Sequence, residues 1–185
     1  MPGELAAQAA IGAFYCEFSA LDHELGETLK VVYRLTSHEA ADAIIAALGD
    51  FARKAGLVSE AVGVAKKADG SETSSDWKEK SRKTMKRILG INRPDRVLMA
   101  HSLLKPNSDG SVQFINLQNA GAKPSSWTQA EFQRKISEMG SLLIQLRQIK
   151  EELSTLTISV PNLGFISMGI NQPSVARNAL LFGKS

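Results

Sequence analysis

Apolar residues recur at steps of three and four along several long segments of the chain, and this period predicts amphipathic helices. The first segment runs from about residue 4 to residue 35. Its apolar stripe consists of Phe14, Phe18, Leu21, Leu25, Leu29 and Val32. A second helix is predicted from the capping box Thr36-Ser37-His38-Glu39 to about Lys67. Gly49-Asp50 and Gly56 predict that this helix bends or breaks into two pieces.

Two further helices are marked by signals at their N-termini. One is predicted to start near Asp76, with Glu79 three residues further on. The last helix has the clearest start, because Thr128 and Glu131 have the spacing of a capping box. Its hydrophobic staple and apolar stripe comprise Trp127, Phe132, Ile136, Met139, Leu143, Leu146, Ile149 and Leu153. These signals predict a helix of about six turns.

Between the third and the last helix the hydrophobic period changes. Two short strands are predicted at Leu103 to Lys105 and Val112 to Leu117, joined by a turn at Asp109-Gly110. Residues 118–126 have the composition of a loop. The pattern therefore predicts an all-α fold, an up-and-down bundle of four to five helices with a small β-hairpin after the third long helix.

The domain organisation follows from length and from a change in composition. A chain of 185 residues favours one domain with a substantial core, and we assign it to residues 1–154. Residues 155–185 contain two charges, Arg177 and Lys184, and several glycines and prolines. We expect this segment to be an arm that docks on the body or on a second subunit, or a disordered tail.

Composition and charge narrow the class of protein. The chain is 43% hydrophobic and 22% charged, as in ordinary globular domains, and its net charge of +3 permits a polyanionic partner without requiring one. Its single cysteine, Cys16, excludes an internal disulfide framework and a cysteine-based metal cluster. No long uncharged apolar run could span a bilayer, and the N-terminus does not resemble a signal peptide. A cytoplasmic location without a membrane partner is therefore expected.

The positive charge is concentrated in one stretch. Residues 76–96 contain eight basic and three acidic residues, a local net charge of +5 in a chain whose total is +3. Such a run is usually a solvated helix face. Its alternative role is binding to a phosphate backbone, for which the candidates are Lys83, Lys86, Arg87 and Arg93. Trp77 could stack on a base but has the spacing of a core residue.

The stretch from Asn92 to Ser102 carries the strongest candidate chemistry. It places Arg96 five residues before His101, in a short helical segment that Pro94 would open. Five residues correspond to about 140° of helix rotation, so convergence requires that His101 lies where the helix ends. An arginine stabilises phosphate charge and a histidine moves a proton near neutral pH, which suffices for RNA cleavage without a metal. In the alternative interpretation, His101 caps the helix C-terminus and Arg96 forms a surface ion pair.

The order of these elements resembles that of the HEPN superfamily. The resemblance covers most of residues 10–154 and includes a long first helix, Arg-x4-His-Ser from Arg96, the Asp-Gly hairpin and the Trp-Thr start of the last helix. Many members are metal-independent ribonucleases of toxin–antitoxin and phage-defence systems. Others only bind nucleotides or RNA, or serve as dimerisation modules.

The resemblance implies specific roles. Arg96 and His101 correspond to the catalytic pair, and an acidic residue of the first helix, Asp22 or less favourably Glu17, would assist them. The implied partners are a second copy of the chain, RNA or a nucleotide, and an antitoxin protein. Val97 departs from the polar residue that commonly follows the motif arginine, which leaves catalytic and non-catalytic binding roles open. Asp22 could equally be the partner of a core cation.

Other site classes lack their motifs. The chain contains no His-x3-His, paired cysteines, glycine-rich phosphate loop or Gly-x-Ser-x-Gly elbow. Zinc hydrolases, P-loop enzymes and α/β-hydrolases are therefore excluded. No cofactor and no metal ligand set are expected.

Overall fold

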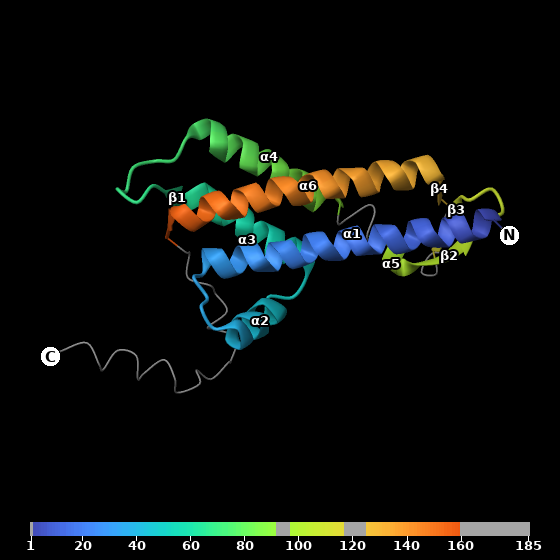
Figure 1. The fold of residues 1–185 in the computed structure, drawn as a ribbon, viewed down its shortest axis with the longest axis horizontal. Helices are drawn as coiled ribbons and strands as arrows, with labels where there is room; N and C mark the ends of the chain where they lie inside the picture. The colour runs from blue at the N-terminus through green and yellow to red at the C-terminus, as the bar shows by residue number, and fades with distance from the viewer. Residues whose placement is uncertain (1, 92–96, 117–124, 160–185) are drawn as a thin grey trace.

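The computed structural model describes residues 2–91, 97–116 and 125–159 of the protein (Figure 1). The helices are α1 (Pro2–Val32), α2 (His38–Ala47), α3 (Phe51–Val64), α4 (Ser75–Ile91), α5 (Val97–His101) and α6 (Gln129–Thr155). The strands are β1 (Ala65–Lys66), β2 (Ser102–Pro106), β3 (Val112–Asn116), β4 (Ser125–Trp127) and β5 (Thr157–Ile158). Helices dominate, as the hydrophobic period predicted, and the strands form two small antiparallel sheets.

The two longest helices, α1 and α6, lie side by side and run in the same direction (Figure 1). Glu24 of α1 bonds Arg147 of α6, and Glu17, two turns earlier, lies against Gly140, seven residues before Arg147. A move of seven residues toward the C-terminus on both helices leads from one contact to the other, so the two helices are parallel. Antiparallel neighbours need only short loops, whereas this parallel pair is joined through all the elements between α1 and α6.

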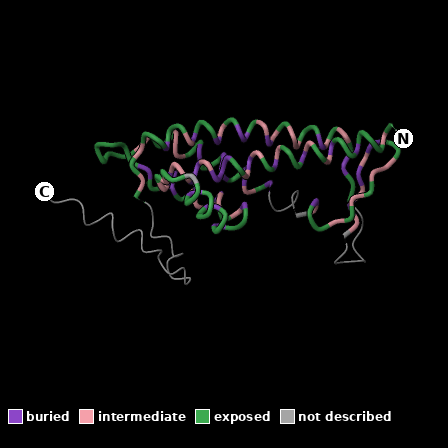
Figure 2. Tube along the Cα trace, turned by 60° about the horizontal axis from the view of Figure 1, so that its bottom comes forward, coloured by how far each residue is buried: buried purple, intermediate pink, exposed green. Residues whose placement is uncertain are grey.

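The other two long helices complete the core. α3 packs on α1, where the rings of Phe18 and Phe51 stack with centroids 4.7 Å apart. α4 packs on α3 and, in the antiparallel sense, on α6. The largest fully buried side chains are Phe14, Phe114, Phe132, Leu21, Leu25, Leu29, Leu48, Met85, Ile88, Met99, Met139 and Leu142. Figure 2 shows buried residues along the inner sides of these helices. Each such side chain contributes about 1.5–3 kcal/mol of burial free energy.

The predicted break in the second helix occurs at Gly49-Asp50. Gly49 adopts a φ of +82°, which favours glycine, and Asp50 then caps α3 by accepting a 2.8 Å hydrogen bond from the Arg53 amide. Gly56 lies within the continuous helix α3. The capping box predicted from Thr36 is wrong, because Ser37 is the N-cap of α2 and makes no side-chain capping bond.

The hairpin lies near the N-terminus of α1 (Figure 1). Leu104 of β2 pairs with Phe114 of β3, and Gly110 in the connecting turn has a φ of +85°. The loop predicted for residues 118–126 is wrong in its last part, because Ser125–Trp127 forms the third strand, β4, beside β3. Residues 117–124 lie outside the described residues.

The junction from β4 into α6 follows the sequence prediction. The Thr128 side chain accepts from the Glu131 amide at 3.3 Å, and the Glu131 carboxylate accepts from the Thr128 amide at 2.7 Å. The Trp127 ring packs on Phe132, with centroids 5.2 Å apart, and also on Phe14 and Phe114. The capping box and the staple are therefore confirmed, and they connect the hairpin to the helical core.

The end of α6 is joined to the body by a pairing that the sequence did not predict. Thr157 and Ile158 of β5 pair with Lys66 and Ala65 of β1, respectively, immediately after α3. The predicted boundary at residue 154 is close to the end of α6 at Thr155. Most of the predicted arm, residues 160–185, lies outside the described residues.

Candidate functional site

His101 is the last residue of α5, at the junction where this short helix passes directly into β2, and it is exposed. α5 is fixed to α1 by the Tyr15 hydroxyl, which donates a 3.2 Å hydrogen bond to the Met99 carbonyl oxygen. The Met99 side chain is buried in the core. The imidazole is therefore presented to solvent from an anchored segment. Arg96 and Arg93 lie outside the described residues.

The basic helix α4 presents Lys83, Lys86 and Arg87 at the surface, as expected for a solvated or nucleic-acid-binding face. The Lys83 ammonium lies 2.6 Å from the Glu79 carboxylate, and the Arg87 guanidinium 3.2 Å from that of Glu138. Surface ion pairs of this kind contribute little net free energy, so a phosphate could displace the carboxylates. The geometry permits both roles of the basic face.

A cavity of about 360 Å³ lies between α4 and α6, and we call it the α4–α6 groove. Lys83 and Arg87 line it together with Lys80 and the half-buried Trp77. The core position expected for Trp77 is therefore only part of its role, because its ring packs on the core and also faces this cavity.

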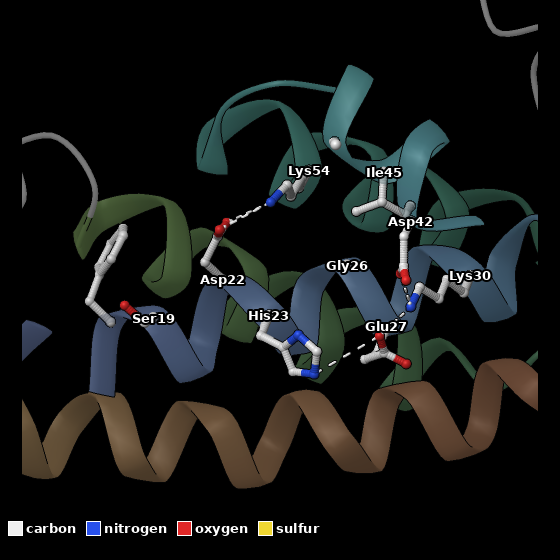
Figure 3. Close-up of a pocket in the computed structure, with 11 residues that line it drawn as sticks. Ser19, Asp22, His23, Gly26, Glu27, Lys30, Asp42, Ile45 and Lys54 are labelled. Atoms are coloured by element: carbon white, nitrogen blue, oxygen red, sulfur yellow. Dashed lines mark hydrogen bonds and ion pairs between the residues drawn. The ribbon is translucent and has the colours of Figure 1, made fainter. Parts of the chain in front are cut away.

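Asp22 lies elsewhere, in a second cavity of about 360 Å³ between α1, α2 and α3 (Figure 3). Its carboxylate accepts hydrogen bonds from the Lys54 ammonium of α3 at 3.0 and 3.1 Å. The Lys54 side chain is 11% exposed, so it is the core cation that the sequence left open as a partner for Asp22. This ion pair joins α1 to α3 beside the stacked pair of Phe18 and Phe51.

The far side of this cavity is closed by α2. The Lys30 ammonium bridges Glu27 of α1 and Asp42 of α2, at 2.6 Å from each carboxylate (Figure 3). Hydrogen bonds to Asp42 and then to Glu27 raise the pKa of Lys30. Gly26 permits the close approach of α2, because a Cβ there would lie 3.0 Å from a methyl group of Ile45. The charged side chains named around this cavity are therefore engaged in ion pairs that join α1 to α2 and α3.

The structure does not bring Asp22 and His101 into one cavity. Tyr15, which contacts α5, and Asp22 are seven residues apart on α1, or about 10 Å along the helix axis. No residue of α5 or β2 lines the Asp22 cavity. Asp22 is thus a structural ion-pair partner in this arrangement, and the candidate reactive group is His101.

Sequence reasoning missed Glu24, the most deeply buried carboxylate among the described residues. Its side chain is 7% exposed and bonds Arg147 at 3.1 Å and also Lys150, both from α6. Burial raises its pKa, but hydrogen bonds and charge from Lys150 and Arg147 outweigh this, and the net effect lowers the pKa. The sequence signal for this burial was the position of Glu24, two residues after Asp22 and directly before Leu25 of the apolar stripe.

No protein-family model, curated protein or solved structure matches the chain. Within residues 2–91, 97–116 and 125–159, no helix combines the length and apolar character needed to cross a membrane. In the same ranges, no group of three or more histidine, cysteine, aspartate or glutamate side chains is arranged to hold a metal ion. A function must therefore be inferred from the chain's own residues.

Proposed function

We propose that the protein is a metal-independent endoribonuclease of the HEPN type, and that the up-and-down order of its helices is that of a HEPN bundle. The observation that carries the proposal is the exposed His101 on the anchored helix α5, at the end of the Arg-x4-His sequence. The helix ends at His101, which is the condition under which Arg96 and His101 can converge despite their spacing. The basic helix α4 leads into this segment and supplies cations for the RNA backbone.

The reaction needs a base, an acid and a cation. The imidazole of His101 takes the proton of a ribose 2′-hydroxyl, and the 2′-oxygen attacks the adjacent phosphorus. The bond from phosphorus to the 5′-oxygen breaks, and that oxygen receives a proton from water or from a second imidazole. The products carry a 2′,3′-cyclic phosphate and a 5′-hydroxyl. Arg96 would stabilise the negative charge on the phosphoryl oxygens during this displacement.

The proposal includes a homodimer in the cytoplasm, with two Arg96–His101 pairs lining one cleft. A second histidine from the partner copy would supply the acid for the leaving oxygen. An antitoxin protein that covers the cleft would keep the nuclease inactive in a toxin–antitoxin or phage-defence system. Asp22 has no role in this reaction, because its carboxylate is held by Lys54.

The second candidate is a non-catalytic HEPN-like module that binds RNA or a nucleotide, or that mediates dimerisation. The pairing of Asp22 with Lys54 favours it, because the acidic residue expected to assist catalysis is engaged in the fold. Val97 in place of a polar residue after the motif arginine favours it too. Both candidates use the basic face of α4.

Incubation of the purified protein with total RNA in EDTA separates the two candidates. We expect the wild type to cleave RNA and His101→Ala to lose cleavage, with unchanged thermal unfolding. His23→Ala is the matched control, since His23 is also an exposed helical histidine but lies beside Glu27, away from α5. Salt-sensitive RNA binding by a protein that never cleaves would support the binding module instead.

A further inference from the structure

The α4–α6 groove combines an aromatic wall, three cations and two fixed polar side chains. The register of α4 against α6 follows from one contact, in which the Thr84 hydroxyl donates a 2.8 Å hydrogen bond to the Gln145 side-chain oxygen. Since α4 and α6 are antiparallel, Trp77, seven residues before Thr84, lies level with Glu152, seven residues after Gln145. The groove therefore has an aromatic end at Trp77 and a cationic end at Arg87.

The aromatic end has the character of a stacking platform. Trp77 is half-buried, with part of its ring packed on the core and part lining the cavity. Its indole nitrogen makes no hydrogen bond to another described residue. Gln145 is oriented by Thr84, so its amide group is left as a donor at the groove wall. The Trp77 ring can hold a nucleobase by stacking, whereas the Gln145 amide lies with Thr84 two turns further along α4, toward the cationic end.

The cationic end can accept phosphates. Lys80, Lys83 and Arg87 line the groove, against one lining carboxylate, Glu152. Their present partners are surface carboxylates, and the Lys80–Asp76 and Lys83–Glu79 pairs join side chains that are each at least 67% exposed. Such pairs have little net stability, so replacement of a carboxylate by a phosphate costs little. Trp77 and Arg87 are ten residues apart, about 15 Å along the helix.

We propose that the α4–α6 groove binds a short run of single-stranded RNA, with one base stacked on Trp77 and the following phosphates at Lys83 and Arg87. The choice of RNA as the ligand rests on the function proposed above. The groove extends this function, because it places substrate recognition on the face between α4 and α6, apart from His101. A cavity of about 360 Å³ has the volume of a small-ligand site.

The test uses the His101→Ala protein in EDTA, so that binding is measured without cleavage. Fluorescence anisotropy of labelled single-stranded oligouridylate and oligoadenylate gives the affinity at several salt concentrations. We expect Trp77→Leu to weaken binding about tenfold without changing the salt dependence, and Trp77→Phe to retain most of the affinity. Arg87→Gln should lower the slope of log affinity against log salt by about 0.7, the value for one phosphate contact to a single strand.

Arg134→Gln is the matched control for Arg87→Gln. Both arginines pair with the same carboxylate, Glu138, at 3.9 and 3.2 Å, but only Arg87 lines the groove. We expect Arg134→Gln to leave affinity and salt slope unchanged. Because Trp77 also packs on the core, Lys83→Gln and Arg87→Gln test the groove independently if Trp77→Leu does not fold.

Two results would overturn the inference. One is RNA binding of wild-type strength in folded Trp77→Leu and Arg87→Gln proteins, which would place the RNA elsewhere. The other is equal affinity for uridine or adenosine monophosphate and for the oligonucleotides, which would make the groove a mononucleotide pocket. Failure of the proposed cleavage would be separate, since a groove that binds RNA in a protein that never cuts would leave this inference intact.

Discussion

At the residue scale, the least expected side chain is Glu24. Its carboxylate is withdrawn from solvent at the α1–α6 interface, where Arg147 and Lys150 reach it from the neighbouring helix. A buried charge of this kind is tolerated only with such partners. The contact also fixes the parallel register of the two longest helices.

Glu24→Gln should destabilise the fold by about 1–3 kcal/mol at neutral pH, because a charged hydrogen-bond acceptor is replaced by a neutral one. The folded-state pKa of Glu24 lies below the ordinary value of 4.5, so its contribution is complete above that value and is lost as the pH falls through the folded pKa. Urea unfolding at neutral pH and at about pH 3 measures this. A wild-type advantage of equal size at both pH values would refute the prediction.

Glu152 is predicted to oppose RNA binding, since its carboxylate lines the α4–α6 groove level with Trp77 and repels the phosphates of a strand bound along the groove. Glu152→Gln should tighten oligouridylate binding by up to about fivefold, the range of a surface charge interaction. Glu151→Gln removes the same charge from an exposed neighbour that does not line the groove, and it serves as the control. An equal gain in both variants would indicate a general charge effect.

The sequence predicted only in part which side chains of α1 are buried. The apolar stripe of α1 is buried as the period indicated, but Asp22 is 35% exposed whereas Glu24 is 7% exposed. The reason is that α1 is covered on one side by α6 and on another by α3. A helical wheel drawn for α1 alone cannot show how much of its circumference the neighbouring helices cover.

At the element scale, α5 is held in position by a tertiary hydrogen bond as well as by the buried Met99 side chain. Tyr15→Phe removes the hydroxyl that donates to the Met99 carbonyl oxygen and should cost about 0.5–1.5 kcal/mol. Amide hydrogen exchange in residues 97–101 should accelerate more than exchange in α6, since the loss is local. Uniform acceleration throughout the protein would show that Tyr15 stabilises the whole core instead. Tyr33→Phe, at another tyrosine packed on the core, is the control.

The start of α6 offers a second test at this scale. Thr128→Ala removes the side chain that accepts from the Glu131 amide and should destabilise the protein by about 1 kcal/mol. Ser37→Ala should have a much smaller effect, because Ser37 occupies the N-cap of α2 without a side-chain capping bond. Thermal unfolding of the two variants provides the comparison. Equal losses would contradict the assignment of the caps.

These two helix starts show which elements a sequence can specify. The capping box of Thr128 depends on four consecutive residues and was predicted correctly. The strands β1, β4 and β5 have two or three residues each. They form by pairing with other segments of the chain, so no local sequence pattern predicts them. Arg93 and Arg96 lie outside the described residues, so their roles stay predictions. The α4–α6 groove could not be predicted, because it requires a tertiary contact between α4 and α6.

At the scale of the whole molecule, the candidate groups lie on different parts of one fold. His101 lies at the hairpin end (Figure 1), the α4–α6 groove lies between the basic helix and α6, and Asp22 lies in the cavity between α1, α2 and α3 (Figure 3). The proposed function assigns RNA binding to the groove and proton transfer to the imidazole at the hairpin end. The packing of α1 against α6 fixes the position of the hairpin end, with His101, relative to the α4–α6 groove.

The most direct test of the account is the chemical identity of the ends that the protein leaves on RNA. A single-stranded oligoribonucleotide is incubated with the protein in EDTA, and the products are analysed by mass spectrometry. The account predicts 2′,3′-cyclic phosphate and 5′-hydroxyl ends, absence of both with His101→Ala, and no cleavage at a 2′-deoxy position. Cleavage of the 2′-deoxy position, or intact RNA with the folded wild-type protein, would contradict it.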